Sequence, residues 1–298
     1  MTRARTIRKK LTCAGIGLHT GKRVNLTLKP APPGHGVVFR RLDLGGAEIP
    51  ASRDSLSAID YATTLSRGTA SVSTTEHLLS AVYGLGIDNL LVELDGPELP
   101  IMDGSAAPFV YLLHEAGIRE QSERRRYLRI RKPIFVGRKD KSMALYPADR
   151  FRVSYTIRFH HPLVGYQTAT YDITADSYAA DIAPARTFCF LRDVEVLRRN
   201  GLALGGSLDN AVVLDDVSIL NDKLRFPDEF VRHKILDAVG DLALMGMPLL
   251  GHVVAYRAGH ALHSELVERL LAERESWDVT TLPAGETSMV PLLAPRTA

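Results

Sequence analysis

The sequence predicts an α+β fold of two similar domains, each a β-sheet layer packed against a pair of helices. A chain of 298 residues is longer than one compact core usually holds. Each half begins with strand-like segments and continues with a helix, a short strand and a second helix. Between the halves, residues 119–126 are polar and charged, which is typical of a solvated connector. We therefore expect domains over residues 1–122 and 127–298, with the functional site between them.

The first half contains both strand and helix signals. Alternation of apolar and polar residues predicts strands at 6–11 and 24–29. The glycine-rich segment 15–21 between them predicts a shaped loop. A helix is expected over 75–83, followed by a buried strand at 89–94 and a second helix at 106–116.

The second half repeats this order. The alternation in its strand segments predicts an antiparallel sheet with one buried face, formed by residues 128–136, 142–146, 151–159 and 168–173. A helix over 228–246, a strand over 249–256 and a helix over 260–274 are expected to follow.

The charge distribution argues against a nucleic-acid-binding protein. The net charge is +3, but residues 119–141 hold ten basic and three acidic residues, so the remainder is slightly acidic. A nucleic-acid binder usually spreads its positive charge along a binding face. A non-catalytic module that binds nucleic acid through residues 119–141 stays open as a rival hypothesis.

The sequence favours a cytoplasmic protein. Cys13 and Cys189 are the only cysteines, and they form neither a disulfide framework nor a metal-binding cysteine motif. No apolar run follows the basic N-terminus, and the most apolar stretch is too short to span a bilayer. We expect no transmembrane segment.

One predicted helix carries a candidate metal site. His233 and Asp237 are four residues apart, so their side chains share one face of the helix, and Asp241 continues that row. A pair at this spacing can chelate a metal ion, although it is also common as a surface pair.

The other half supplies Glu76 and His77 near the start of the corresponding helix. The helix dipole also favours a glutamate there, so a structural role is the alternative. His77, His233 and Asp237 together would give three protein ligands with one open position, which is the catalytic form of a zinc site. The donor set suits Zn²⁺ and does not exclude Fe²⁺.

Several ordered motifs then resemble one family. They are GIGLHTG at 15–21, TTEHL at 74–78, IDN at 87–89, IMDGSAAPF at 101–109, ARTF at 185–188, FVRHKILD at 230–237 and GHAL at 259–262. This pattern resembles the bacterial UDP-3-O-acyl-N-acetylglucosamine deacetylases, the LpxC family. The resemblance implies a zinc-dependent amidase that removes acetyl from UDP-3-O-(3-hydroxyacyl)-N-acetylglucosamine, the committed step of lipid A synthesis in Gram-negative bacteria. It also implies that zinc lies between two similar domains.

The resemblance assigns roles to single residues. It implies that Glu76 is the general base, and that His260 is an acid or an electrostatic stabiliser with Asp241 oriented toward it. Which of the two roles His260 plays stays open. Thr187 and Lys234 match groups around the reacting carbonyl. The matched zinc ligands are His77, His233 and Asp237.

The resemblance also implies a hydrophobic passage for the fatty-acyl chain, formed by residues 188–213. The substrate-binding residues expected from it are Leu18, Phe188, Phe190, Gly206 and Ser207, with Lys141, Phe159 and Asp193 around the sugar nucleotide. A basic side chain is expected at the pyrophosphate. A zinc amidase with a different acyl or sugar substrate is the nearest rival.

The remaining expectations concern single residues and the assembly. Thr64 stands where some members of the family carry a cysteine close to the metal. His19 is expected near the site without an assigned role, and His263 is expected to be a surface or capping residue. The resemblance suggests a monomer.

Overall fold

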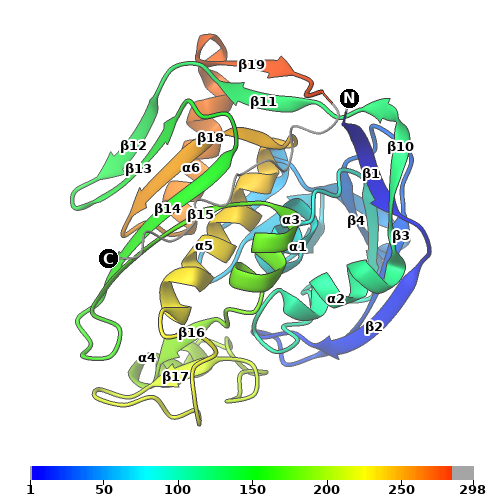
Figure 1. The fold of residues 1–298 in the computed structure, drawn as a ribbon. Coiled ribbons are helices and arrows are strands. Elements are labelled where there is room, and N and C mark those ends of the chain that lie inside the picture. The colour runs from blue at the N-terminus through cyan, green and yellow to red at the C-terminus, as the bar shows by residue number, and fades with distance from the viewer. Residues whose placement is uncertain (1, 284–298) are drawn as a thin grey trace.

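The computed structural model describes residues 2–283, which form a mixed α+β fold with several sheets (Figure 1). One five-stranded sheet belongs to the first part of the chain. Its order is β2 (Leu11–Ile16), β3 (Arg23–Pro30), β9 (Leu90–Leu94), β4 (Val37–Arg41) and β5 (Ala47–Pro50). Strand β9 runs antiparallel to β3 and parallel to β4. The apolar residues Val24, Leu26 and Leu28 of β3 are buried, as their alternation predicts.

The two expected helices lie before and after β9 in the chain. They are α1 (Glu76–Gly84) and α2 (Ala107–Ala116), and they pack against each other. A three-stranded sheet precedes α1, formed by β6 (Leu56–Ala58), β7 (Thr64–Arg67) and β8 (Ala70–Val72). The sequence did not reveal this small sheet, because its strands are too short for an alternation to stand out.

Two expectations about the ends of this half are wrong. Residues 119–126 were expected to be a connector, but most of them form β10 (Ile118–Arg124), which pairs antiparallel with β1 (Arg3–Ile7). The strand is largely exposed, so its polar composition reflects an exposed strand rather than a loop. The strand expected over 6–11 is divided between β1 and β2 by a bend at residues 8–10.

A seven-stranded sheet dominates the second part of the chain. Its strands are β11 (Tyr127–Ile130), β12 (Ile134–Arg138), β13 (Lys141–Tyr146), β14 (Phe151–Arg158), β15 (Tyr166–Asp172), β18 (Leu249–Tyr256) and β19 (Trp277–Thr280). The sheet is mixed and not antiparallel throughout, because β18 pairs parallel with β11 and β14. The strand expected over 128–136 is two strands, separated near Pro133, which has no backbone N–H to donate to a ladder.

Helices α5 (Glu229–Leu242) and α6 (His260–Ala272) complete the second part. Helix α5 is shorter than the expected 228–246, because a 3₁₀ turn at Ala243–Met245 follows it. Helices α1 and α5 lie side by side in the centre of the molecule (Figure 1). Gly240 of α5 allows this approach, since a Cβ built there would lie only 2.1 Å from the backbone oxygen of Glu76. The hydroxyl of Ser80 donates across the same contact to the carbonyl of Leu236 at 2.8 Å.

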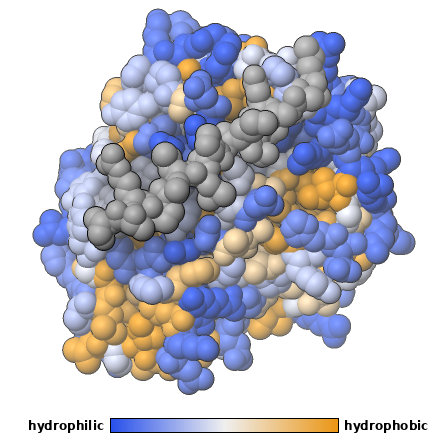
Figure 2. Space-filling model, viewed as in Figure 1, coloured by the Kyte–Doolittle hydropathy of each residue, from blue (hydrophilic) through white to orange (hydrophobic). Residues whose placement is uncertain are grey.

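The chain between β15 and α5 forms a mainly irregular segment. It includes α3 (Ala175–Ser177), then β16 (Phe188–Phe190), which pairs parallel with β17 (Val212–Leu214), and between these strands α4 (Leu191–Arg199). Figure 2 shows apolar side chains gathered at the lower left of the molecule, where Figure 1 places β16, α4 and β17. Exposed apolar residues of this segment are Leu191, Val196, Leu204, Leu208, Val217 and Leu220.

Candidate metal centre and catalytic site

The three predicted metal ligands lie together where α1 meets α5. His77 is in the first turn of α1, while His233 and Asp237 are one turn apart on α5. The Oδ1 atom of Asp237 lies 3.2 Å from Nε2 of His233 and 3.8 Å from Nε2 of His77. One donor atom from each residue lies within 4.8 Å of the others, and all three residues are buried. Three side chains this close can share one cation.

The protonation of these side chains fits a metal ion. Burial, and then the neighbouring His233, lower the pKa of His77 to about 3, so its imidazole is in the neutral form that binds metal. Burial raises the pKa of Asp237, but His233 and Lys234 hold it well below its ordinary value. His233 donates from Nδ1 to the carbonyl of Ala185 at 3.0 Å, which leaves Nε2 as its metal-binding atom. The donor set therefore fits a divalent cation that accepts nitrogen and carboxylate ligands.

A buried carboxyl group lies beside the ligand set. Glu76 precedes His77 in α1 and is 4% exposed. Its Oε2 accepts the backbone N–H of Thr63 at 3.0 Å. Burial raises the pKa of Glu76 to about 7, although the charge of His260 opposes the rise. A carboxyl with this pKa can both take and release a proton near neutral pH.

A second polar group is built around Asp241, one turn beyond Asp237 on α5. Its Oδ2 lies 2.6 Å from Nδ1 of His260, the first residue of α6. Burial lowers the pKa of His260, but Asp241 raises it to about 9, so the ring is a cation at neutral pH. Burial raises the pKa of Asp241, but the charge of His260 holds it below its ordinary value. The structure thus pairs the Asp241 carboxylate with the His260 imidazolium.

Two further side chains contact Asp241, and neither was anticipated. His263 was expected at the surface or as a cap, but it is fully buried, and its Nδ1 lies 2.7 Å from Oδ2 of Asp241. The hydroxyl of Thr63 donates to Oδ1 at 2.5 Å. Thr63 is therefore the threonine that contacts this group, whereas Thr64 lies on β7. The spacing of three between His260 and His263 on one helix was the available signal for His263.

Lys234 and Thr187 were both predicted around the reacting carbonyl. Lys234 donates from Nζ to Oδ2 of Asp237 at 2.7 Å, and Nζ lies 5.9 Å from the centre of the Phe188 ring. Thr187 directly precedes β16, where its backbone N–H donates to Gly104 at 2.8 Å. The structure brings Lys234 to the ligand set and places Thr187 next to Phe188 in the chain.

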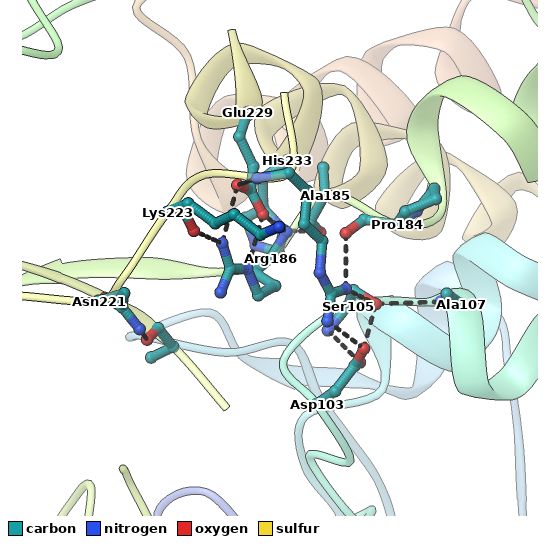
Figure 3. A network of polar contacts seen from close by, with 12 residues as sticks. Asp103, Ser105, Ala107, Pro184, Ala185, Arg186, Asn221, Lys223, Glu229 and His233 are labelled. Atoms are coloured by element: carbon teal, nitrogen blue, oxygen red, sulfur yellow. Dashed lines mark hydrogen bonds and ion pairs between the residues drawn. The ribbon is translucent and has the colours of Figure 1, made fainter. Parts of the chain in front are cut away.

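A network of ion pairs supports the segment that holds His233 (Figure 3). Glu229 lies one turn before His233, is fully buried, and accepts from Nε of Arg186 at 2.8 Å. Arg225 pairs with Asp103 at 2.9 Å and donates to the carbonyl of Pro184 at 2.9 Å. The network fixes residues 184–186, whose middle carbonyl orients the His233 ring. Supporting contacts of this kind explain motif residues that are not themselves ligands.

Three of the predicted substrate-binding residues form an aromatic cluster. The ring centre of Phe159 lies 5.6 Å from that of Phe188 and 5.8 Å from that of Phe190. Phe188 also lies 5.0 Å from Phe230 of α5. The cluster connects β16 with the helix that carries His233 and Asp237.

The glycine-rich loop meets the segment that follows α4. The N–H of Gly205 donates to the carbonyl of Leu18 at 3.0 Å, and a Cβ built on Gly206 would lie 3.7 Å from the side chain of Leu18. The next residue, Ser207, donates its N–H to Asn210 at 2.9 Å. Leu18 and Gly206, far apart in sequence, are therefore neighbours. His19 of this loop still has no assigned role.

The remaining two predicted substrate residues lie at the surface. Lys141 is exposed at the start of β13, and Asp193 is exposed on α4. Within residues 2–283, neither forms a hydrogen bond or ion pair with the metal ligands.

Four of the ten basic residues in segment 119–141 form ion pairs among the described residues, and Arg138 is one of them, paired with Glu265 at 3.0 Å. Arg129 and Arg131 both pair with Asp278, at 3.2 and 2.7 Å. Arg125 pairs with Asp88 at 2.9 Å. These four charges are therefore not available to a free basic face of the kind that a nucleic-acid binder needs. Among the described residues, no helix is both long enough and apolar enough to cross a membrane.

A buried pair of histidines and an aspartate, next to a carboxyl of raised pKa and an imidazolium, is the arrangement of a metal-dependent hydrolase. The comparisons with known proteins agree with this class. Residues 4–272 match the family model of LpxC, the UDP-3-O-acyl N-acetylglycosamine deacetylases. The chain belongs to this family.

Relatives named UDP-3-O-acyl-N-acetylglucosamine deacetylase cover almost the whole chain. A protein of Myxococcus xanthus is 53% identical over 277 residues, which cover 92% of this chain and 88% of that protein. One of Thioalkalivibrio sulfidiphilus is 48% identical over 100% of both chains. One of Xylella fastidiosa is 46% identical over 98% of both chains.

Proposed function

We propose that this deacetylase uses Zn²⁺, held by His77, His233 and Asp237, to hydrolyse the N-acetyl group of UDP-3-O-(3-hydroxyacyl)-N-acetylglucosamine. The reaction releases acetate and is the committed step of lipid A synthesis. The relatives are named for a UDP-3-O-acyl-N-acetylglucosamine substrate, which supports this assignment. The observation that carries the proposal is the buried ligand set with Glu76 directly beside it. Fe²⁺ satisfies the same donor set and is the alternative metal.

When bound, the metal supplies Lewis acidity toward water and toward the acetamide carbonyl. Glu76 is the base: its carboxylate takes the proton from the attacking water. The backbone N–H of Thr63 orients Glu76 by holding Oε2 at 3.0 Å. With a pKa of about 7, Glu76 can accept this proton at neutral pH and pass it on to the leaving nitrogen.

Positive and hydroxyl donors stabilise the oxygen on which negative charge develops. His260 enters the reaction as a cation because Asp241 keeps its Nδ1 protonated. Its charge either stabilises this oxygen or supplies a proton to the leaving nitrogen. We assign Lys234 and the Thr187 hydroxyl to the same group of donors. One donor of this kind is typically worth about 3 kcal/mol of transition-state stabilisation.

The acyl chain is proposed to follow the apolar segment 188–213. The aromatic cluster of Phe159, Phe188 and Phe190 and the contact between Leu18 and Gly206 supply apolar surface close to β16. Ser207 is proposed as a polar contact in the same segment, and Asp193 as a contact of the sugar nucleotide. Lys141 is proposed to meet the pyrophosphate, because its ammonium group is exposed and not held by an ion pair among the described residues.

We further propose that residues 1–122 and 127–298 are two domains, with the site at their junction. Both parts contain a helix, a strand and a helix in this order, α1–β9–α2 and α5–β18–α6. In both, the strand between the helices has parallel and antiparallel neighbours: β9 pairs with β4 and β3, and β18 pairs parallel with β11 and β14 and antiparallel with β13. His77 comes from the first part, and His233 and Asp237 come from the second. A cytoplasmic location and a monomeric state remain predictions.

An assay of acetate release tests the proposal. The purified protein, its metal content measured, is given UDP-3-O-(3-hydroxyacyl)-N-acetylglucosamine and, in parallel, UDP-N-acetylglucosamine without the acyl chain. We expect turnover of the acylated substrate and loss of turnover in His233→Ala together with loss of bound zinc. Equal turnover of both substrates would indicate an amidase of different specificity, and metal-free protein that binds nucleic acid would indicate the rival module.

A further inference from the structure

We propose that His263 and Tyr155 are positioning residues that hold the Asp241 carboxylate in the orientation in which it accepts the hydrogen bond from His260. The inference rests on the proposed function, because it concerns the group that activates His260. Neither residue lies among the motifs that point to the metal. Both are fully buried, His263 on α6 and Tyr155 on β14.

The two histidines share one oxygen of Asp241. Nδ1 of His260 lies 2.6 Å from Oδ2, and Nδ1 of His263 lies 2.7 Å from the same atom. Their rings are nearly perpendicular, at 82°, with centres 5.9 Å apart. The other oxygen, Oδ1, accepts the hydroxyl of Thr63 at 2.5 Å. Three donors therefore hold the two oxygens of the carboxylate, and removal of the His263 donor leaves Oδ2 with the hydrogen bond from His260 alone.

The hydrogen-bond geometry fixes which nitrogen of His263 carries its proton. A carboxylate can only accept hydrogen bonds, so Nδ1 of His263 must be the protonated nitrogen. Burial lowers the pKa of His263, and the ring therefore stays neutral, with a lone pair on Nε2. The hydroxyl of Tyr155 lies 3.1 Å from Nε2. Burial raises the pKa of Tyr155 well above its ordinary value, so this phenol keeps its proton and donates it.

Tyr155 thus acts on Asp241 only through His263. With the hydroxyl in place, the tautomer with a proton on Nδ1 is favoured, because Nδ1 can donate to Asp241 while Nε2 accepts from Tyr155. In the other tautomer Nδ1 would face the carboxylate with a lone pair, and the hydroxyl would have to turn to accept from Nε2. Without the hydroxyl, Nε2 is a buried acceptor with no donor, and the preference for the correct tautomer weakens. An asparagine at position 263 has no such second tautomer. Its amide carries a donor at a distance along the side chain similar to that of Nδ1, and it does not need the tyrosine.

Substitutions of His263 and Tyr155 test this chain of contacts through their effects on kcat. In His263→Leu, which removes the donor, kcat should fall about 10- to 100-fold, the range expected for a lost hydrogen bond to a charged group. The KM should change by less than about threefold, because no substrate contact is removed. In His263→Asn, kcat should recover to within about threefold of the wild-type value.

Tyr155→Phe gives the sharper test. Alone it should lower kcat by about threefold to tenfold, the effect of a weakened tautomer preference. In the His263→Asn background the same change should have no further effect on kcat, so the two substitutions should be strongly non-additive. Tyr178→Phe is the matched control: its equally buried hydroxyl donates to Ser80 at 2.8 Å and not to the His263–Asp241 group. It should lower the melting temperature and leave kcat unchanged.

Bound zinc and the melting temperature are measured for every variant, so that a loss of kcat is not a loss of metal or fold. The inference is overturned if folded, zinc-loaded His263→Leu keeps wild-type kcat, or if Tyr155→Phe costs the same in both backgrounds. Should His263→Leu fail to fold, the comparison of Tyr155→Phe in the two backgrounds decides alone. An inactive wild-type protein would instead contradict the proposed function.

Discussion

Gly240 provides a prediction in which two physical effects have opposite signs. In an exposed helix interior, Gly→Ala raises stability by about 1 kcal/mol through helix propensity. At Gly240, however, the new Cβ would lie 2.1 Å from the backbone oxygen of Glu76 and 2.8 Å from its carbonyl carbon. An ordinary contact begins near 3.4 Å. Helices α1 and α5 must therefore separate by roughly 1 Å, and such overpacking typically costs about 1–3 kcal/mol.

The separation would act directly on the metal site. His77 moves with α1, while His233 and Asp237 move with α5, so the spacing between the ligands grows. We expect Gly240→Ala to lower the melting temperature by about 2–8 °C. We also expect it to weaken zinc affinity and to lower kcat/KM by about 100-fold, the effect of a misplacement of about 1 Å.

Differential scanning calorimetry and competition with a zinc chelator measure these two effects. Gly96→Ala is the control, because the nearest atom to its new Cβ is a side-chain carbon of Val24 at an ordinary 3.5 Å. It should change neither stability nor zinc affinity by much. A Gly240→Ala protein that is more stable than wild type and binds zinc equally well would refute the argument that α1 and α5 touch through this glycine.

Three further predictions follow from the charged groups. The kcat/KM should fall as pH rises through about 9, because only the protonated His260 ring serves the reaction and Asp241 raises the pKa of this ring to about 9 against the effect of burial. In the pH profile of Asp241→Asn, this fall should move to lower pH. Asp88→Asn should cost about 2–3 kcal/mol in denaturant unfolding, because it breaks the ion pair with Arg125, and it should leave kcat unchanged. Removal of metal by a chelator should lower the melting temperature and abolish acetate release, and one equivalent of Zn²⁺ should restore both.

The sequence predicts most of the central helices and strands because their apolar periodicity is strong. The strand at 249–256 is found as predicted, and α1, α2 and α6 begin and end within two residues of the expected bounds. One error falls where polar composition hides regular structure. Residues 118–124 form an exposed edge strand, and its charged side chains resemble those of a loop.

Helical spacing alone predicts only the part of the candidate site that lies on one helix. His233, Asp237 and Asp241 follow from their spacing of four, and the structure places them on one side of α5. The contact of His77 with them depends on the crossing of α1 and α5, which no local pattern encodes. His263 and Thr63 were missed for a related reason: their significance lies in the shared carboxylate of Asp241, which only the tertiary structure reveals.

The most direct test of the account compares turnover with bound zinc in Glu76→Gln. This substitution keeps the size of the side chain but removes the group that accepts the proton. The account predicts one equivalent of bound zinc, an unchanged fold and a loss of kcat of about 100-fold or more. Zinc-loaded Glu76→Gln protein with wild-type turnover would contradict the assignment of Glu76 as the base beside the His77, His233 and Asp237 site.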